Sequence, residues 1–181
     1  MNIRDFARQF QFQPLAAELH PQHLPASVAS QVQGQELIVF AVADEASDTE
    51  QFSARYGFGL EDCANTIVLR YKKDGVEQHA AVVTLGSRRL DVNGAVKSAL
   101  GAQRLSFAKR EVATALTGME FGGITALGLP ASMRILVDAA VMARRYVVVG
   151  AGVRHSKLLL SPALLAQLAQ AEVAALTFDS D

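Results

Sequence analysis

The segment Thr117–Pro130 constrains this chain more than any other part of its sequence. It holds four glycines within eleven residues (Gly118, Gly122, Gly123 and Gly128), and its flanks are typical of an ordinary helix and strand. Glycine tolerates positive φ and lets a backbone approach another group closely, at a cost in conformational entropy. Such a loop can turn its N–H and C=O groups toward a ligand. Many glycine-rich loops are only turns. The neighbouring segments are therefore needed to distinguish a ligand-binding loop from a simple turn.

Length and composition limit the class of protein. Half of the 181 residues are hydrophobic and 19% are charged, which predicts one compact globular domain. The formal net charge of −1 disfavours a non-specific DNA binder, and the apolar runs are too short to cross a bilayer. The N-terminus lacks the apolar core of a secretory signal, so we expect a cytoplasmic protein with no membrane partner. Cys63 is the only cysteine, which excludes an intrachain disulfide, and we expect it to be buried.

Strands and helices are predicted in mixed order. Apolar and β-branched runs predict strands at 36–43, 65–71, 76–85, 133–137, 146–149 and 157–160. Capping residues and glycine stops predict helices at 47–56, 91–100, 107–117, 138–144 and 161–170. The predicted caps are Ser47, Asp91, Asp138 and Ser161, and the predicted stops are Gly57, Gly101 and Gly118. An Asp74-Gly75 turn should join the second and third strands as a hairpin. Because no regular βαβ alternation appears, the pattern favours an α+β or mixed α/β fold.

The familiar catalytic and cofactor motifs are absent. The sequence contains no GxxxxGK[ST] loop, no GxGxxG, no HExxH and no Gly-x-Ser-x-Gly elbow. The four histidines lack the spacing of metal ligands. We therefore predict neither a metal site nor a cofactor.

An ordered series of segments carries more information than any single motif. Cys63–Leu69 and His79–Val83 come first, then Leu90-Asp91-Val92 and Ala99–Ala102, and then the glycine-rich loop. The strand Ile135–Asp138, the run Val147–Gly152 and the Ser161-Pro162 helix start follow. This series resembles the YbaK and prolyl-tRNA-synthetase-associated editing domains, a family of aminoacyl-tRNA deacylases, over residues 46–168.

The resemblance implies a fold and a domain division. We expect a central, mostly antiparallel, barrel-like sheet with surrounding helices. Residues 1–44 would be a variable lead-in packed on the domain, and residues 45–181 would be the editing domain.

The resemblance also implies an activity, which is hydrolysis of the ester between a wrong amino acid and the terminal adenosine of tRNA. The protein would act in trans, with the aminoacylated 3′ end of tRNA as its partner and no DNA. In the family the substrate lies between the sheet and the glycine-rich loop, and a lysine at the start of the first hairpin strand helps to hold it. A sugar hydroxyl of the substrate is thought to place the attacking water.

The chain departs from the family pattern at the residues nearest the chemistry. Asn65 stands at the lysine position, and an amide offers no positive charge to an oxyanion. Ala126 replaces a frequent proline, which implies a looser loop. Lys157 stands where an acidic residue is usual. We predict that Asn65 and Lys157 carry the chemistry, with Lys157 supplying the missing charge; the alternative is that Lys157 faces solvent.

The other candidate residues would bind the substrate. They are Gly122, Gly123, Ile124, Thr125, Gly128 and His155, with an apolar lining from Ile67, Val82, Ile124 and Leu127. Thr125 and His155 could instead make only local hydrogen bonds. Two alternatives to the deacylase stay open: a catalytically degenerate module that binds the tRNA 3′ end or a small aminoacyl or nucleotide ligand, and a hydrolase of another ester or amide.

Overall fold

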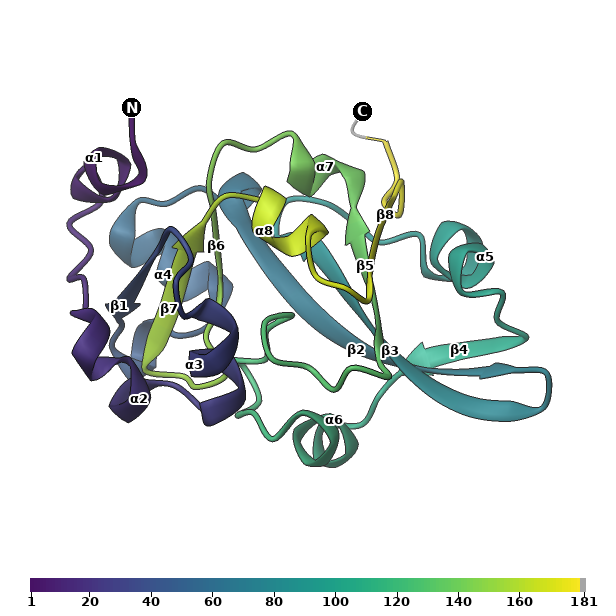
Figure 1. The fold of residues 1–181 in the computed structure, drawn as a ribbon. Helices are drawn as coiled ribbons and strands as arrows, with labels where there is room; N and C mark the ends of the chain where they lie inside the picture. Colours follow the sequence, from purple (N-terminus) through teal and green to yellow (C-terminus); the bar gives the residue numbers. More distant parts are fainter. Residues whose placement is uncertain (180–181) are drawn as a thin grey trace.

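Residues 1–179 of a computed structural model of the chain are described here (Figure 1). One strongly twisted sheet runs through them, in the strand order β1-β7-β6-β2-β3-β5-β8, with β4 beside β2. The strands are β1 (Leu37–Ala41), β2 (Cys63–Lys73), β3 (Val76–Leu85), β4 (Arg104–Phe107), β5 (Arg134–Asp138), β6 (Val147–Gly150), β7 (Ser156–Leu160) and β8 (Ala171–Ala174).

Short helices surround this sheet. They are α1 (Ile3–Arg8), α2 (His20–His23), α3 (Ala26–Val32), α4 (Thr49–Tyr56), α5 (Lys97–Leu100), α6 (Arg110–Thr117), α7 (Ala139–Met142) and α8 (Ala163–Ala166). Helices α1 to α4 gather around the end of the sheet that holds β1 and β7, whereas α5 lies at the other end (Figure 1). None of the helices in residues 1–179 combines the length and the apolar composition that crossing a bilayer would require.

The sheet is mixed and open. Within the described residues, four strand pairs are antiparallel and three are parallel. Strands β1 and β8 lie at its two ends and do not pair with each other. The predicted mixed α/β fold with a mostly antiparallel sheet is thus confirmed, although the sheet does not close into a barrel.

The β2–β3 hairpin is the longest feature of the sheet. Its register runs from Lys73↔Val76 at the turn to Ala64↔Leu85 at the far end. Asp74 and Gly75 both have positive φ, 51° and 79°, as the tight hairpin turn requires. The Asp-Gly signal therefore gave the turn correctly, and the hairpin places Asn65 far from it, near the centre of the molecule.

Apolar side chains fill three clusters on the two faces of the sheet. The largest cluster includes Val28 of α3 and Leu127 of the glycine-rich loop, together with residues of β3, β5, β6 and β7. A second cluster is aromatic and brings Phe12, Phe40 and Phe52 together around Phe58. The third lies between the hairpin and α5. Folding removes the apolar surface of these clusters from water, and each Å² removed stabilises the domain by about 25 cal/mol.

The first 41 residues are built into the domain. Strand β1 pairs with β7 along its length, and Gln13 and Leu15 hydrogen-bond to the other edge of β1. Helix α3 packs on the glycine-rich loop so closely that a Cβ on Gly128 would lie 2.8 Å from the backbone of Ser27. The proposed domain boundary at residue 44 stays a prediction. Residues before it nevertheless form the β1 edge of the sheet and pack against the glycine-rich loop.

Several predicted boundaries were wrong. Helix α4 has Asp48 at its N-cap instead of Ser47, whose buried hydroxyl has no partner among the described residues. Phe107 ends a strand, so α6 begins only at Arg110. Asp138 does stand at the N-cap position of α7, but its carboxylate accepts hydrogen bonds from Leu176 and Thr177 instead of from that helix. Strands β4 and β8 have only four residues each, which is too short for a strand pattern to be recognised in the sequence.

Candidate functional site

A cavity of about 530 Å³ lies between the first half of β2, the glycine-rich loop, α4 and β7. Its lining is largely apolar, with a few polar groups that converge on it, as is typical of small-molecule sites. The lining residues are Asp48, Thr49, Asn65, Thr66, Ile67, Val68, Phe107, Ala108, Ala113, Phe121, Gly122, Ile124, Gly150 and Lys157. The glycine-rich loop thus faces the beginning of the hairpin.

Three of the lining residues lie side by side across adjacent strands. Gly150 of β6 pairs with Lys157 of β7. On the other side, Ala64 of β2 pairs with Val149 of β6, so the next residues along these parallel strands are Asn65 and Gly150. Asn65 and Lys157 therefore flank Gly150, and their side chains share one face of the sheet because residues opposite one another on adjacent strands point to the same side.

The missing side chain at Gly150 makes room for the loop. A Cβ there would lie 2.7 Å from the carbonyl oxygens of both Gly123 and Ile124. Gly123 in turn accepts a hydrogen bond of 2.6 Å from the backbone N–H of Gly152. The glycine-rich loop therefore packs directly on Gly150 of β6, between Asn65 of β2 and Lys157 of β7.

Lys157 is buried, with 7% of its surface exposed. Burial in these apolar surroundings lowers the pKa of its ammonium group, while Cys63 and Asp48 act in the opposite direction. The Lys157 side chain forms no ion pair within 4.0 Å among the described residues, and Lys157 is one of the residues that line the cavity. Since a buried cation without a carboxylate partner is costly, this lysine is available to an anionic or carbonyl ligand.

Asn65 is held in one orientation. Its side-chain carbonyl oxygen accepts a hydrogen bond of 2.7 Å from the hydroxyl of Thr49, the first residue of α4. An amide side chain has an acceptor oxygen and two N–H donors. Within residues 1–179 the Asn65 NH2 group donates to no other residue, so both of its N–H donors are available to a ligand.

Arg154 ties the loop to the segment before α4. Its guanidinium donates to Asp44 at 3.1 Å and to Asp48 at 3.4 Å, and it reaches the carbonyl oxygen of Phe121 at 3.5 Å. Its backbone N–H donates to Glu120. These contacts raise the pKa of the guanidinium, first through the hydrogen bond to Asp44. Arg154 thereby fixes one wall of the cavity.

Two aromatic rings at the mouth of the cavity are exposed. Phe107 is 58% exposed and Phe121 is 45% exposed, although both line the cavity. The Arg110 guanidinium lies 4.9 Å from the Phe121 ring centroid. Exposed rings beside a basic side chain suit stacking on planar, negatively charged ligands such as nucleotides.

The structure brings half of the predicted site residues to the cavity. Asn65, Lys157, Gly122 and Ile124 line it, whereas Gly123, Thr125, Gly128 and His155 do not. Gly123 and Gly128 pack against backbone, and Thr125 is fully buried with a hydroxyl that has no partner in residues 1–179. His155 is exposed and lies edge-on to His23. Of the predicted apolar lining, Ile67 and Ile124 are present, while Val82 and Leu127 belong to the core.

Sequence reasoning missed several residues of the site. Thr49 and Phe121 lie inside a predicted helix start and the glycine-rich loop, but nothing in either pattern singled them out. Arg154 and Phe107 had no motif around them, because their partners are distant along the chain. The only signal was Asp44 and Asp48 at a spacing of one helical turn, and nothing pointed from them to Arg154. Among the described residues, no group of three or more His, Cys, Asp or Glu side chains could hold a metal ion.

Comparison with solved structures confirms the fold first. A crystal structure of hypothetical protein APE2540 is 23% identical and superposes with a TM-score of 0.75, covering 84% of this chain and 99% of that one. A candidate trans-editing enzyme for prolyl tRNA synthetase is 21% identical, with a TM-score of 0.72 and coverage of 86% and 99%. At these identities the likeness establishes the fold alone, a mixed α/β domain.

The family follows from the sequence. The model of the aminoacyl-tRNA editing domain matches residues 43–168, so this chain belongs to that family. The resemblance to YbaK-type editing domains is thereby confirmed. The same fold also forms 31% of a candidate signal-transduction protein from Marinobacter aquaeolei VT8, at 17% identity and a TM-score of 0.58. No curated protein is similar enough in sequence to count as a match.

Proposed function

We propose that this protein deacylates mischarged tRNA in trans. The observation that carries the proposal is the position of Lys157 and Asn65 on either side of Gly150, where both residues line the cavity beneath the glycine-rich loop. Membership of the editing family supplies the substrate class, and the fold shared with a candidate trans-editing enzyme supports action on free aminoacyl-tRNA.

The chemistry is hydrolysis of an ester. Water adds to the carbonyl carbon, and the carbonyl oxygen becomes an oxyanion. The bond to the ribose oxygen then breaks, and this oxygen takes a proton as the free amino acid leaves. Lys157 and the N–H groups of Asn65 are the donors that we assign to the oxyanion, where preorganised donors lower the barrier most. We assign placement of the attacking water to a ribose hydroxyl of the substrate.

The cavity also offers a means of selecting the amino acid. Ile67, Val68, Ile124 and Ala113 form an apolar wall, so a side chain that fits would gain about 0.8 kcal/mol per buried methylene. Discrimination by size in such a pocket is modest, typically 10- to 200-fold. The exposed rings Phe107 and Phe121 would then hold the terminal bases outside the cavity.

A panel of mischarged tRNAs, incubated with the wild type and with Asn65→Lys, tests the proposal. Release of amino acid by the wild type supports the deacylase. One observation favours a second candidate, a degenerate module that only binds the tRNA end: Asn65 stands where the family has lysine. Activity gained only in Asn65→Lys would support that module. Binding of tRNA without hydrolysis by either protein would contradict the deacylase.

A further inference from the structure

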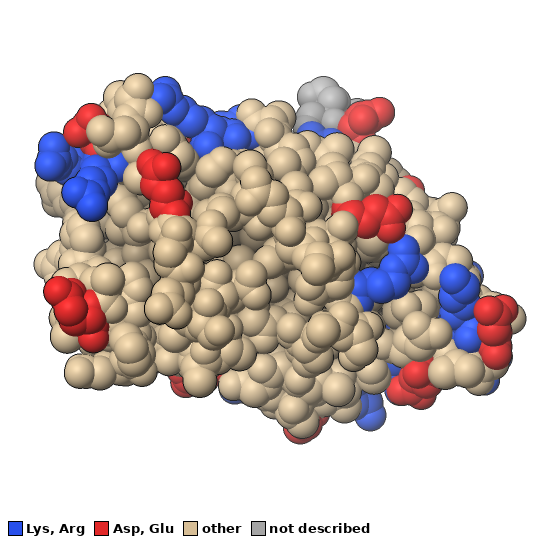
Figure 2. Space-filling view, viewed as in Figure 1, with Lys and Arg blue, Asp and Glu red and all other residues tan. Residues whose placement is uncertain are grey.

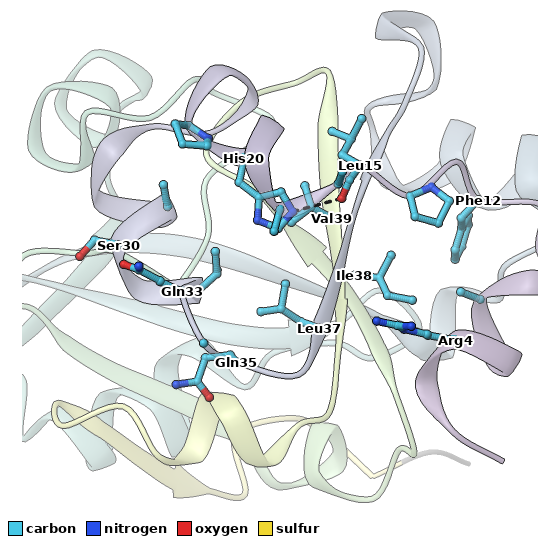
Figure 3. A pocket seen from close by; sticks show the side chains of 18 of the residues that line it. Arg4, Phe12, Leu15, His20, Ser30, Gln33, Gln35, Leu37, Ile38 and Val39 are labelled. Carbon is cyan, nitrogen blue, oxygen red and sulfur yellow. Dashed lines mark hydrogen bonds between the residues drawn. The ribbon is translucent and has the colours of Figure 1, made fainter.

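A second and larger cavity lies at the β1 end of the sheet, away from the site described above. Its volume is about 960 Å³, and its lining comes from residues 4–39 alone. Strand β1 forms its floor, α1 stands at one end, and α2 and α3 form the opposite wall (Figure 3). All of these residues precede the segment 43–168 that matches the editing family, so the groove is not part of the family's matched region.

The floor of this groove is a strand edge that is only partly covered. The backbone N–H of Leu15 donates to the carbonyl of Val39, and Ala41 donates to Gln13, so residues 13–15 already extend the sheet there. The chain turns away at Ala16 into a 3-10 turn at Ala17–Leu19. Successive residues of an antiparallel strand direct their N–H and C=O groups to opposite edges. Leu37, two residues before Val39, therefore directs its N–H and C=O to the same edge of β1 as Val39 does, at a point that residues 13–15 no longer reach.

Unpaired strand edges attract extended chains. A peptide that adds to such an edge gains main-chain hydrogen bonds, and its alternate side chains enter the pockets beside the strand. The Leu15, Leu37 and Val39 side chains provide an apolar floor of this kind (Figure 3). The His20 ring lies beside the middle of this floor, and its Nε2 lies 3.2 Å from the carbonyl oxygen of Leu15 (Figure 3).

The charge of the groove limits what can bind. Its lining contains Arg4 and Arg8 and no acidic residue. Both arginines belong to α1 at a spacing of four residues, and both are exposed. Arg8 forms an ion pair of 3.1 Å with Asp5 of the same helix, whereas Arg4 forms no ion pair among the described residues. Figure 2 shows Lys and Arg side chains around α1 at this end of the face, with Asp and Glu side chains beside them. An occupant that carries a carboxylate near α1 would be attracted, whereas a basic segment would be repelled.

We propose that this groove binds an extended, acidic peptide segment of a partner protein, which pairs with the free edge of β1 at Leu37 and places carboxylates beside Arg4 and Arg8. The volume exceeds what a single amino acid needs and is within the range of peptide and ligand sites. The binding is separate from deacylation, since no residue of the groove lines the other cavity.

Selection from a random heptapeptide library on the full chain tests this proposal. We expect the enriched peptides to carry Asp or Glu among apolar residues. The variant Arg4→Glu/Arg8→Glu should weaken their binding at least about tenfold. The matched variant Lys72→Glu/Arg104→Glu makes the same charge change on β2 and β4, remote from the groove, and should leave their affinity unchanged.

Hydrogen exchange of the Leu37 amide supplies a readout that charge alone would not move. We expect an enriched peptide to slow this exchange about tenfold or more. The proposal is overturned if no peptide is enriched, if enriched peptides bind the Arg4→Glu/Arg8→Glu variant equally well, or if Leu37 exchange does not change. A loss of tRNA affinity in that variant without peptide enrichment would instead assign the groove to nucleic acid.

Discussion

Lys157 holds its ammonium group 5.3 Å from the centroid of the Phe52 ring, and Phe52 is fully buried. The contact between a cation and an aromatic face offsets part of the cost of burial. It does not remove that cost, because the pKa of Lys157 remains below its ordinary value of 10.5. The protein therefore keeps a charge in its interior at the expense of stability, which is common at functional sites.

This cost predicts that Lys157→Met stabilises the protein near neutral pH. The folded state binds fewer protons than the unfolded state between the lowered pKa of Lys157 and 10.5, so the wild type gains stability as the pH rises through that window. Each unit of pKa shift corresponds to about 1.4 kcal/mol. Urea unfolding from pH 6 to 10 should show an advantage of Lys157→Met that shrinks toward high pH. Lys109→Met, at an exposed lysine, is the control.

The hydrogen bond from Thr49 to Asn65 predicts a positioning role for Thr49. Thr49→Val keeps the shape of the side chain and removes the donor, so the Asn65 amide can rotate away from the cavity. A neutral hydrogen bond contributes about 1 kcal/mol, which is about fivefold in rate. We expect kcat for deacylation to fall by that factor with little change in KM. An equal fall on Thr66→Val, whose hydroxyl has no such contact to Asn65, would contradict the role.

Close packing at Gly150 predicts that a single methyl group displaces the loop. In Gly150→Ala the new Cβ would overlap the carbonyl oxygens of Gly123 and Ile124. We expect a loss of about 1–3 kcal/mol in the free energy of unfolding together with a loss of deacylation. Gly75→Ala is the matched control. Its φ of 79° strains an alanine by about 1 kcal/mol, yet nothing lies within 4 Å of the new Cβ. That variant should lose stability and keep its activity.

The exposed rings at the cavity mouth predict an effect on tRNA affinity. Base stacking on an aromatic ring contributes about 1–3 kcal/mol, so Phe121→Ala and Phe107→Ala should each raise KM at least fivefold and leave kcat nearly unchanged. Phe178→Ala is a close control, because Phe178 is 44% exposed and the Arg89 guanidinium lies 4.4 Å from its ring, as Arg110 does beside Phe121. If all of these variants behave alike, stacking at the mouth is excluded.

Local signals in the sequence predicted most of the fold. The Asp74-Gly75 turn, the Asp91 cap and the glycine stops at Gly57, Gly101 and Gly118 are in place, because each depends on neighbouring residues. Strand β4 was missed because it is held by pairing with β2, and Ser47 was wrongly chosen as a cap because tertiary packing buries it.

The candidate site was predictable only in outline. The family resemblance predicted that the glycine-rich loop faces the beginning of the β2–β3 hairpin, as it does. Of the two alternatives for Lys157, the exposed one was wrong, because the residue is buried. The roles of Gly123 and Gly128 in packing could not be read, since a glycine that touches a ligand and one that touches backbone look the same in sequence. Arg154, which joins Asp44 to the loop, depends on contacts more than 100 residues apart.

The most direct test of the account is the single-turnover rate at which Lys157→Met releases amino acid from the mischarged tRNA that the wild type deacylates best. If the buried ammonium stabilises the oxyanion, the rate should fall by about 100- to 1000-fold. Because the same variant is expected to be the more stable protein, unfolding would not explain the loss. A rate equal to that of the wild type would contradict the central claim.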